Sequence, residues 1–265
     1  MTRVVVPGRP GKAPGRPGLS DPAGRDDDDG TVVAMSDQTS APGLAPAASP
    51  SPSPTTSTSL GRGLAVAVAA VGPLAVAGVR LLLPSDTTDD SAGVVAKTLA
   101  HPELQTVVLW LDYLALLTLP LAVLLVAGRA VRAAPVLGWI GAVIAWLGFA
   151  TLPWIAALDP VPLAARDAGL APDAAARLLD ALSVVGPAGL EGAVFVACHV
   201  LGTVLLGLAL WRAVPRWAAI AVVVSQPLHF VAAVVLSSHV LDAVAWGLTA
   251  LGFAVVVAVA RPART

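Results

Sequence analysis

Six long apolar blocks follow one another in this chain, and they constrain its fold more than any other feature. Each block holds about 20 or more residues, enough to cross roughly 30 Å of hydrocarbon as a helix. The blocks cover residues 64–83, 104–127, 136–158, 190–211, 217–236 and 240–260. With 56% hydrophobic residues, 12% charged residues and a mean hydropathy of +0.80, the chain is too apolar for an ordinary soluble domain. The sequence therefore predicts an all-α polytopic membrane protein with six transmembrane helices, whose main partner is the lipid bilayer.

The placement of charged residues predicts the orientation of these helices. The short segments expected at the cytoplasmic face carry seven arginines and no acid: Arg62, Arg129, Arg132, Arg212, Arg216, Arg261 and Arg264. The segments expected outside carry four cationic residues: Arg80, Lys97, Arg166 and Arg177. Short cytoplasmic loops are enriched in Lys and Arg. We therefore expect both termini in the cytoplasm. The formal net charge of −1 suggests no nucleic-acid partner.

Residues 1–60 differ in composition from the rest of the chain. They are rich in Pro, Gly, Ser, Thr and Asp, and they lack the apolar stretch of a cleavable signal peptide. Such a segment buries too little apolar surface to offset the entropy of ordering. We expect 1–60 to be a disordered cytoplasmic tail and 61–265 to form the transmembrane domain. Two interpretations of the tail stay open: an interaction segment, or a true start at Met35 with residues 1–34 not translated.

Residues 172–185 have the pattern of an amphipathic helix in one of the loops expected outside. Leu178, Leu179, Leu182 and Val185 fall on one helical stripe, whereas the charged residues lie away from it. This pattern predicts a helix that lies flat on the outer surface and caps the bundle. Residues 91–100 favour a second, shorter helix in another outer loop.

A layer of polar residues is the candidate site. Ionisable residues inside spans are costly, so each is a functional-site hypothesis. Asp112 falls inside the second span. His199 and His229 are equidistant from Val214, the centre of the turn between their spans, so they are expected at equal depth. Three further residues lie near this layer: Gln226, His239 and Asp242.

Three explanations of this layer remain open. The residues could fix helix register through hydrogen bonds between helices, in a scaffold or accessory role. They could form a proton, cation or small-ligand site in the outer half of the bundle. His199 and His229 could instead ligate a metal or haem, with or without enzymatic chemistry. No catalytic or phosphate-binding motif is recognisable in the spans or loops. The sequence therefore requires no cofactor and favours a non-enzymatic protein.

Three stretches carry a resemblance to other proteins: VRLLLPSDTTDD, AHPELQTVVLWLDYLALLTLP and SQPLHFVAAVVLSSHVLD. Together with the six-span layout, they resemble multi-pass membrane proteins of high-G+C Gram-positive bacteria that have no known activity. The resemblance covers about residues 64–260. It implies a bacterial plasma membrane as the location, and it assigns no role to any residue.

Overall fold

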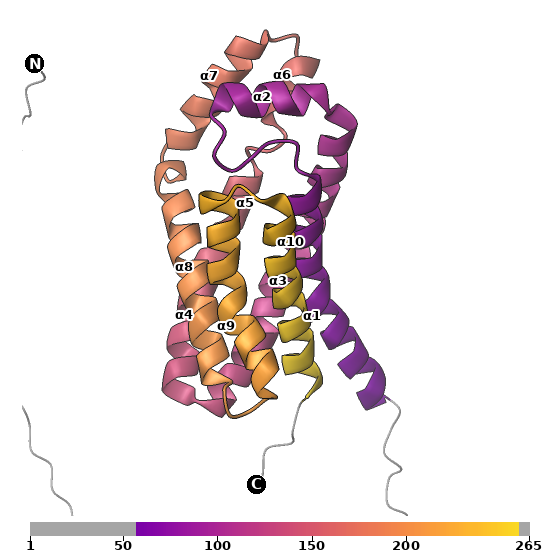
Figure 1. Cartoon of the computed structure of the whole chain (residues 1–265), viewed down its shortest axis with the longest axis vertical. Coiled ribbons are helices and arrows are strands. Elements are labelled where there is room, and N and C mark those ends of the chain that lie inside the picture. Colours follow the sequence, from indigo (N-terminus) through magenta and orange to yellow (C-terminus); the bar gives the residue numbers. More distant parts are fainter. Residues whose placement is uncertain (1–56, 260–265) are drawn as a thin grey trace, which may run out of the picture. The chain divides into compact units, whose positions relative to one another are not determined.

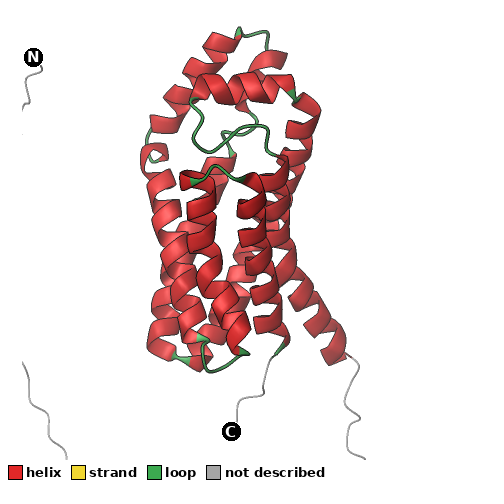
Figure 2. Ribbon diagram, viewed as in Figure 1, coloured by secondary structure: helices red, strands yellow, loops and turns green. Residues whose placement is uncertain are grey.

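The computed structural model describes residues 57–259, and every regular element in that part of the chain is helical (Figure 2). Six helices are long and apolar enough to cross a membrane. They cover Leu60–Leu82, Pro102–Ala133, Pro135–Asp167, Ala188–Ala209, Arg216–Val235 and His239–Ala258. The prediction of an all-α, six-span membrane protein is therefore confirmed.

Most spans are single helices, but two are interrupted. The continuous ones are α1 (Ser57–Leu82), α3 (Pro102–Ala133), α8 (Ala188–Ala209) and α10 (His239–Ala258). The third span is α4 (Pro135–Ala150) followed by the short α5 (Leu152–Ala156), and the fifth is α9 (Arg216–Phe230) followed by a π-helical turn, η1 (Val231–Val235). Prolines lie near both interruptions, Pro153 in α5 and Pro227 in α9, where their missing N–H groups weaken the helical ladder.

The beginning of α1 bears on the expected tail. The helix starts at Ser57, so it begins within the segment 1–60 that was expected to be disordered. The remainder of that segment, with both candidate start sites, lies outside the described residues.

Close contacts between small residues hold the bundle together. A Cβ atom at Gly202 of α8 would lie 2.2 Å from the backbone nitrogen of Ala145 in α4. One at Gly148 of α4 would lie 2.3 Å from the nitrogen of His199 in α8. Both distances are shorter than any real Cβ contact, so only glycine permits this approach. The α4–α8 pair is thereby fixed with backbone against backbone, as is common between transmembrane helices.

Three short helices form a cap at one end of the bundle: α2 (Ser91–Ala100), α6 (Val161–Asp167) and α7 (Pro172–Val184) (Figure 1). They pack on one another around a small apolar core of Val95, Ala165, Ala175, Ala176 and Leu179. The two helices expected at 91–100 and 172–185 are therefore present. We call this end of the bundle the capped end; the α3–α4 and α8–α9 turns lie at the opposite end.

The face of α7 that packs against the other cap helices is narrower than its apolar stripe. Leu179 is buried, but Leu178, Leu182 and Val185, the rest of the expected stripe, are exposed. The buried positions are instead Ala175, Ala176 and Leu179, because α7 packs against α2 and α6 with small side chains that allow a close approach. Most of the apolar stripe therefore faces away from α2 and α6.

Candidate functional site

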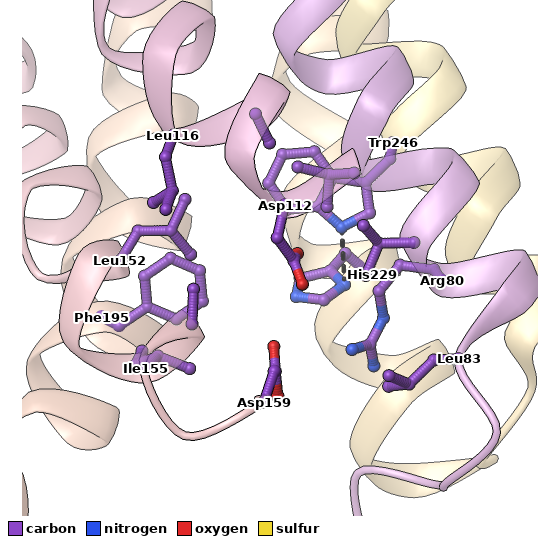
Figure 3. Close-up of a pocket in the computed structure, with 14 residues that line it drawn as sticks. Arg80, Leu83, Asp112, Leu116, Leu152, Ile155, Asp159, Phe195, His229 and Trp246 are labelled. Carbon is purple, nitrogen blue, oxygen red and sulfur yellow. Dashed lines mark hydrogen bonds between the residues drawn. The ribbon is translucent and has the colours of Figure 1, made fainter. Parts of the chain in front are cut away.

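A cavity of about 140 Å³ opens among the helices near the capped end. Side chains from α1, α3, α5, α8, α9 and α10 line it (Figure 3). Its walls are largely apolar, with Leu116, Leu152, Ile155, Phe195 and Trp246 among them. Its polar lining consists of Arg80, Asp112, Asp159 and His229. We call this space the acidic cavity, and it has room for several waters or a small ligand.

Two carboxyl groups define the polar side of the acidic cavity. Figure 3 shows Asp112 and Asp159 directed into the same space from opposite sides. Gln105, which is 2% exposed, donates from Nε2 to the backbone carbonyl of Asp159 at 3.0 Å and so fixes the turn that carries it. The Oδ2 atom of Asp112 is buried and has no hydrogen-bond partner among residues 57–259. The cavity therefore holds two acids, at least one of which has an unsatisfied oxygen.

The cationic side of the cavity is already paired. Arg80 of α1 donates through Nε to Asp242 of α10, in an ion pair whose acid is 1% exposed. His229 of α9 approaches the other oxygen of Asp242 with Nδ1, at 2.5 Å. The carboxylate of Asp242 thus joins three helices. The ion pairs among the described residues include none between Arg80 and Asp112 or Asp159.

His229 has two competing neighbours at the same nitrogen. Trp246 Nε1 points at His229 Nδ1 from 3.2 Å (dashed line, Figure 3). One nitrogen cannot donate to Asp242 and accept from Trp246 at once. The contact with Asp242 is the shorter of the two, which indicates that Nδ1 carries the proton and donates to that carboxyl group.

The equal depth expected for His199 and His229 agrees with their positions, since their ring centroids are 5.4 Å apart. His199 is fully buried, stacks on Phe195 and does not line the cavity. Its Nδ1 lies 2.5 Å from the carbonyl oxygen of Phe195. Gln226 is also fully buried and donates from Nε2 to Thr249 Oγ1 at 2.7 Å. These two residues lie behind the cavity wall.

His239 belongs to different surroundings. Its Nε2 lies 2.8 Å from Asp86 in the loop after α1, and Lys97 donates to the same carboxyl group at 2.6 Å. These two partners, Lys97 more than His239, hold the pKa of Asp86 below its usual value. His239 and Asp242 share a helix end but have separate partners, so the structure does not bring them together as one site.

The geometry gives little support to the hypothesis that His199 and His229 ligate a metal. Within residues 57–259 no group of three or more His, Cys, Asp or Glu side chains is placed to hold one metal ion. His199 and His229 are neighbours, but Nδ1 of each already contacts a carbonyl or carboxylate oxygen of the protein.

Two residues of the cavity are missing from the candidates that the sequence provides, Arg80 and Asp159. Arg80 was assigned to the outer segments as one of their cationic residues. The sequence could have identified Arg80 as a candidate, because it lies within the first apolar block, 64–83, where a charge is unusual. Asp159 directly follows the third block, in the turn between α5 and α6, and lines the cavity from there.

Comparison of the chain with models of known protein families, with curated proteins and with solved structures finds no match. The geometry of the acidic cavity is therefore the basis for assigning a function to this integral membrane protein.

Proposed function

We propose that this integral membrane protein binds a small cation in the acidic cavity, with a proton as the competing occupant. The observation that carries the proposal is the pair Asp112 and Asp159, which face one cavity while the nearby Arg80 is paired with Asp242. Two carboxylates in a largely apolar space repel each other, and a cation or a proton between them removes that repulsion.

The walls of the cavity suit a cation with some apolar surface. Phe195 and Trp246 contribute aromatic rings to the lining, and aromatic faces attract cations. The remaining wall is aliphatic, which favours an ammonium group with a short alkyl substituent over a strongly hydrated metal ion. An alkylammonium ion of a few carbons combines a single positive charge with the apolar contact that these walls offer.

The proposal is tested by thermal unfolding of purified protein in lipid nanodiscs. Methylammonium, ethylammonium, sodium and the bulky N-methylglucamine are compared as chlorides at equal ionic strength. A ligand that binds only the folded state raises the melting temperature with its concentration. We expect this rise with the small alkylammonium ions, and we expect it to weaken as the pH is lowered and protons compete.

Two variants make the test specific. Asp112→Asn removes one cavity charge with little change in shape, and we expect it to abolish the cation-dependent rise. Asp180→Asn is the matched control, because Asp180 is exposed on α7, outside the cavity. Equal responses of the wild type and Asp112→Asn, or no response to any small cation, would refute the proposal.

A further inference from the structure

A second group of polar side chains lies one helical turn deeper than the acidic cavity. It consists of Thr203 on α8, Gln226 on α9 and Thr249 on α10, all 0% exposed. We call it the deep polar tier. Each member lies three or four residues beyond an aromatic ring near the cavity, on the side away from the cap; these rings are His199, His229 and Trp246. The three rings contact one another, with centroids 5.3–6.4 Å apart.

The members of the deep polar tier lie on three successive spans, and two of them are in direct contact. Gln226 reaches α10 directly, through its bond to Thr249. Thr203 lies on the same face of α8 as Gly207, four residues further on. A Cβ atom at Gly207 would lie 2.6 Å from the side chain of Val223 in α9. Thr203 therefore faces α9 as well, one turn closer to the cap, where Gln226 lies.

Three buried polar atoms of α8 and α9 have no hydrogen-bond partner within the described part of the chain: Thr203 Oγ1, Gln226 Oε1 and His199 Nε2. Their chemistry is complementary to one small molecule. A carbonyl oxygen only accepts, so His199 Nδ1 must donate to Phe195, which leaves Nε2 of the neutral ring as an acceptor. Gln226 Oε1 is a second acceptor, and the Thr203 hydroxyl is a donor.

We propose that these three atoms bind a buried water molecule. The water donates to His199 Nε2 and Gln226 Oε1 and accepts from the Thr203 hydroxyl, and three hydrogen bonds are typical of internal waters. Leaving three polar atoms unpaired in the interior would be costly, whereas one water satisfies them all. The site goes beyond the proposed cation binding and does not depend on it. It extends the polar interior of the bundle from the acidic cavity, past the rings, toward the middle of the span.

The helices close tightly beyond this site. A Cβ atom at Gly252 of α10 would lie 2.7 Å from the side chain of Val222 in α9, and Gly207 meets Val223 equally closely. In that turn α9 also buries Ser225, whose hydroxyl donates to the carbonyl of Val222 in the same helix. The water site is a closed end of the polar interior and not a passage through the membrane.

The first test is the isosteric substitution Thr203→Val. With a water bound, this variant removes its hydrogen-bond donor, and we expect the melting temperature to fall by about 2–4 °C. In a dry interior the same change would remove an unpaired hydroxyl and would raise it. The control is Thr118→Val, because Thr118 on α3 bonds only to the carbonyl of Leu114 in its own helix. We expect a smaller change there.

The second test detects the water without a loss of stability. Water-edited solid-state NMR on ¹⁵N-histidine protein in lipid bilayers measures magnetisation transfer from water to each ring nitrogen. The His199 signal is assigned by its loss in His199→Gln. We expect rapid transfer to an unprotonated Nε2 of His199, reduced in Thr203→Val. A raised or unchanged melting temperature in Thr203→Val would overturn the proposal. Absence of water transfer to His199 would overturn it as well, whatever the melting temperature.

Discussion

At the scale of single residues, Asp242 is a buried carboxylate that joins three helices. Its side chain is 1% exposed, and its two oxygens contact Arg80 on α1 and His229 on α9. Removing one partner of a buried ion pair leaves the other without compensation, which typically costs 3–5 kcal/mol. Because Arg80 keeps 20% of its side chain exposed, we expect Asp242→Asn to lower the free energy of unfolding by about 3 kcal/mol, the lower end of that range.

The measurement is the unfolding free energy in mixed micelles, compared with Asp173→Asn. Asp173 is exposed in the first turn of α7, so neutralising it removes no buried pair. We expect that control to change stability by less than about 0.5 kcal/mol. Similar values for the two variants would show that the Arg80–Asp242–His229 contacts contribute little.

Counting residues predicts depth, because each residue of a helix advances the chain by a fixed rise. His199 and His229 therefore lie at the same level, as their spacing from Val214 indicates. Counting does not predict which way a side chain faces. Gln226 is on the same helical face as His229, yet it turns to Thr249 one level deeper and not to the cavity. Rotation of one span against another is set by packing, and the sequence shows only its depth.

At the scale of helices, glycine decides how closely α4 and α8 approach. A Cβ at Gly202 would lie 2.2 Å from the nitrogen of Ala145, an atom of a helix backbone that cannot move alone. Overpacking of this kind typically costs 1–3 kcal/mol, and backbone contacts are the least tolerant. We expect Gly202→Ala to lower the unfolding free energy by about 2–3 kcal/mol, measured by chemical or thermal unfolding.

Gly192 offers a control within the same helix. A Cβ there meets nothing within 4 Å. Gly192→Ala therefore adds no clash, and alanine has the higher helix propensity. We expect it to leave stability unchanged or slightly raised. A Gly202→Ala variant as stable as Gly192→Ala would mean that α4 and α8 separate without cost, contrary to the packing described.

The length of the apolar blocks allowed the six spans to be predicted, because a bilayer sets a minimum length for each. The interruption between α4 and α5 was not predicted, although the sequence contains its cause. Thr151 and Pro153 lie within an apolar block, and hydropathy alone does not reveal a break in a helix there. Asp159 follows α5, in the turn before α6, and lines the cavity from there. The same limit applies to α7, whose buried face is set by contact with α2 and α6.

At the scale of the whole molecule, charge is distributed unevenly along the bundle axis. The end opposite the cap carries the arginines of the α3–α4 and α8–α9 turns: Arg129, Arg132, Arg212 and Arg216. The capped end carries the acids of the loop after α1 and the acidic cavity. The positive-inside tendency then predicts that the capped end faces outward. In that orientation, cations would reach Asp112 and Asp159 from outside the cell, across an acidic surface that concentrates them.

This orientation is tested with two cysteine variants in the background Cys198→Ala, which removes the single native cysteine. Ala168 follows α6 in the cap and Ala213 lies in the α8–α9 turn, and both are exposed. In intact cells, we expect a membrane-impermeant maleimide to label Ala168→Cys and to leave Ala213→Cys unlabelled until the membrane is permeabilised. The cysteine-free parent gives the background. Labelling of Ala213→Cys in intact cells, with protection of Ala168→Cys, would invert the topology. The acidic cavity would then face the cytoplasm, and its proposed cation would come from inside the cell.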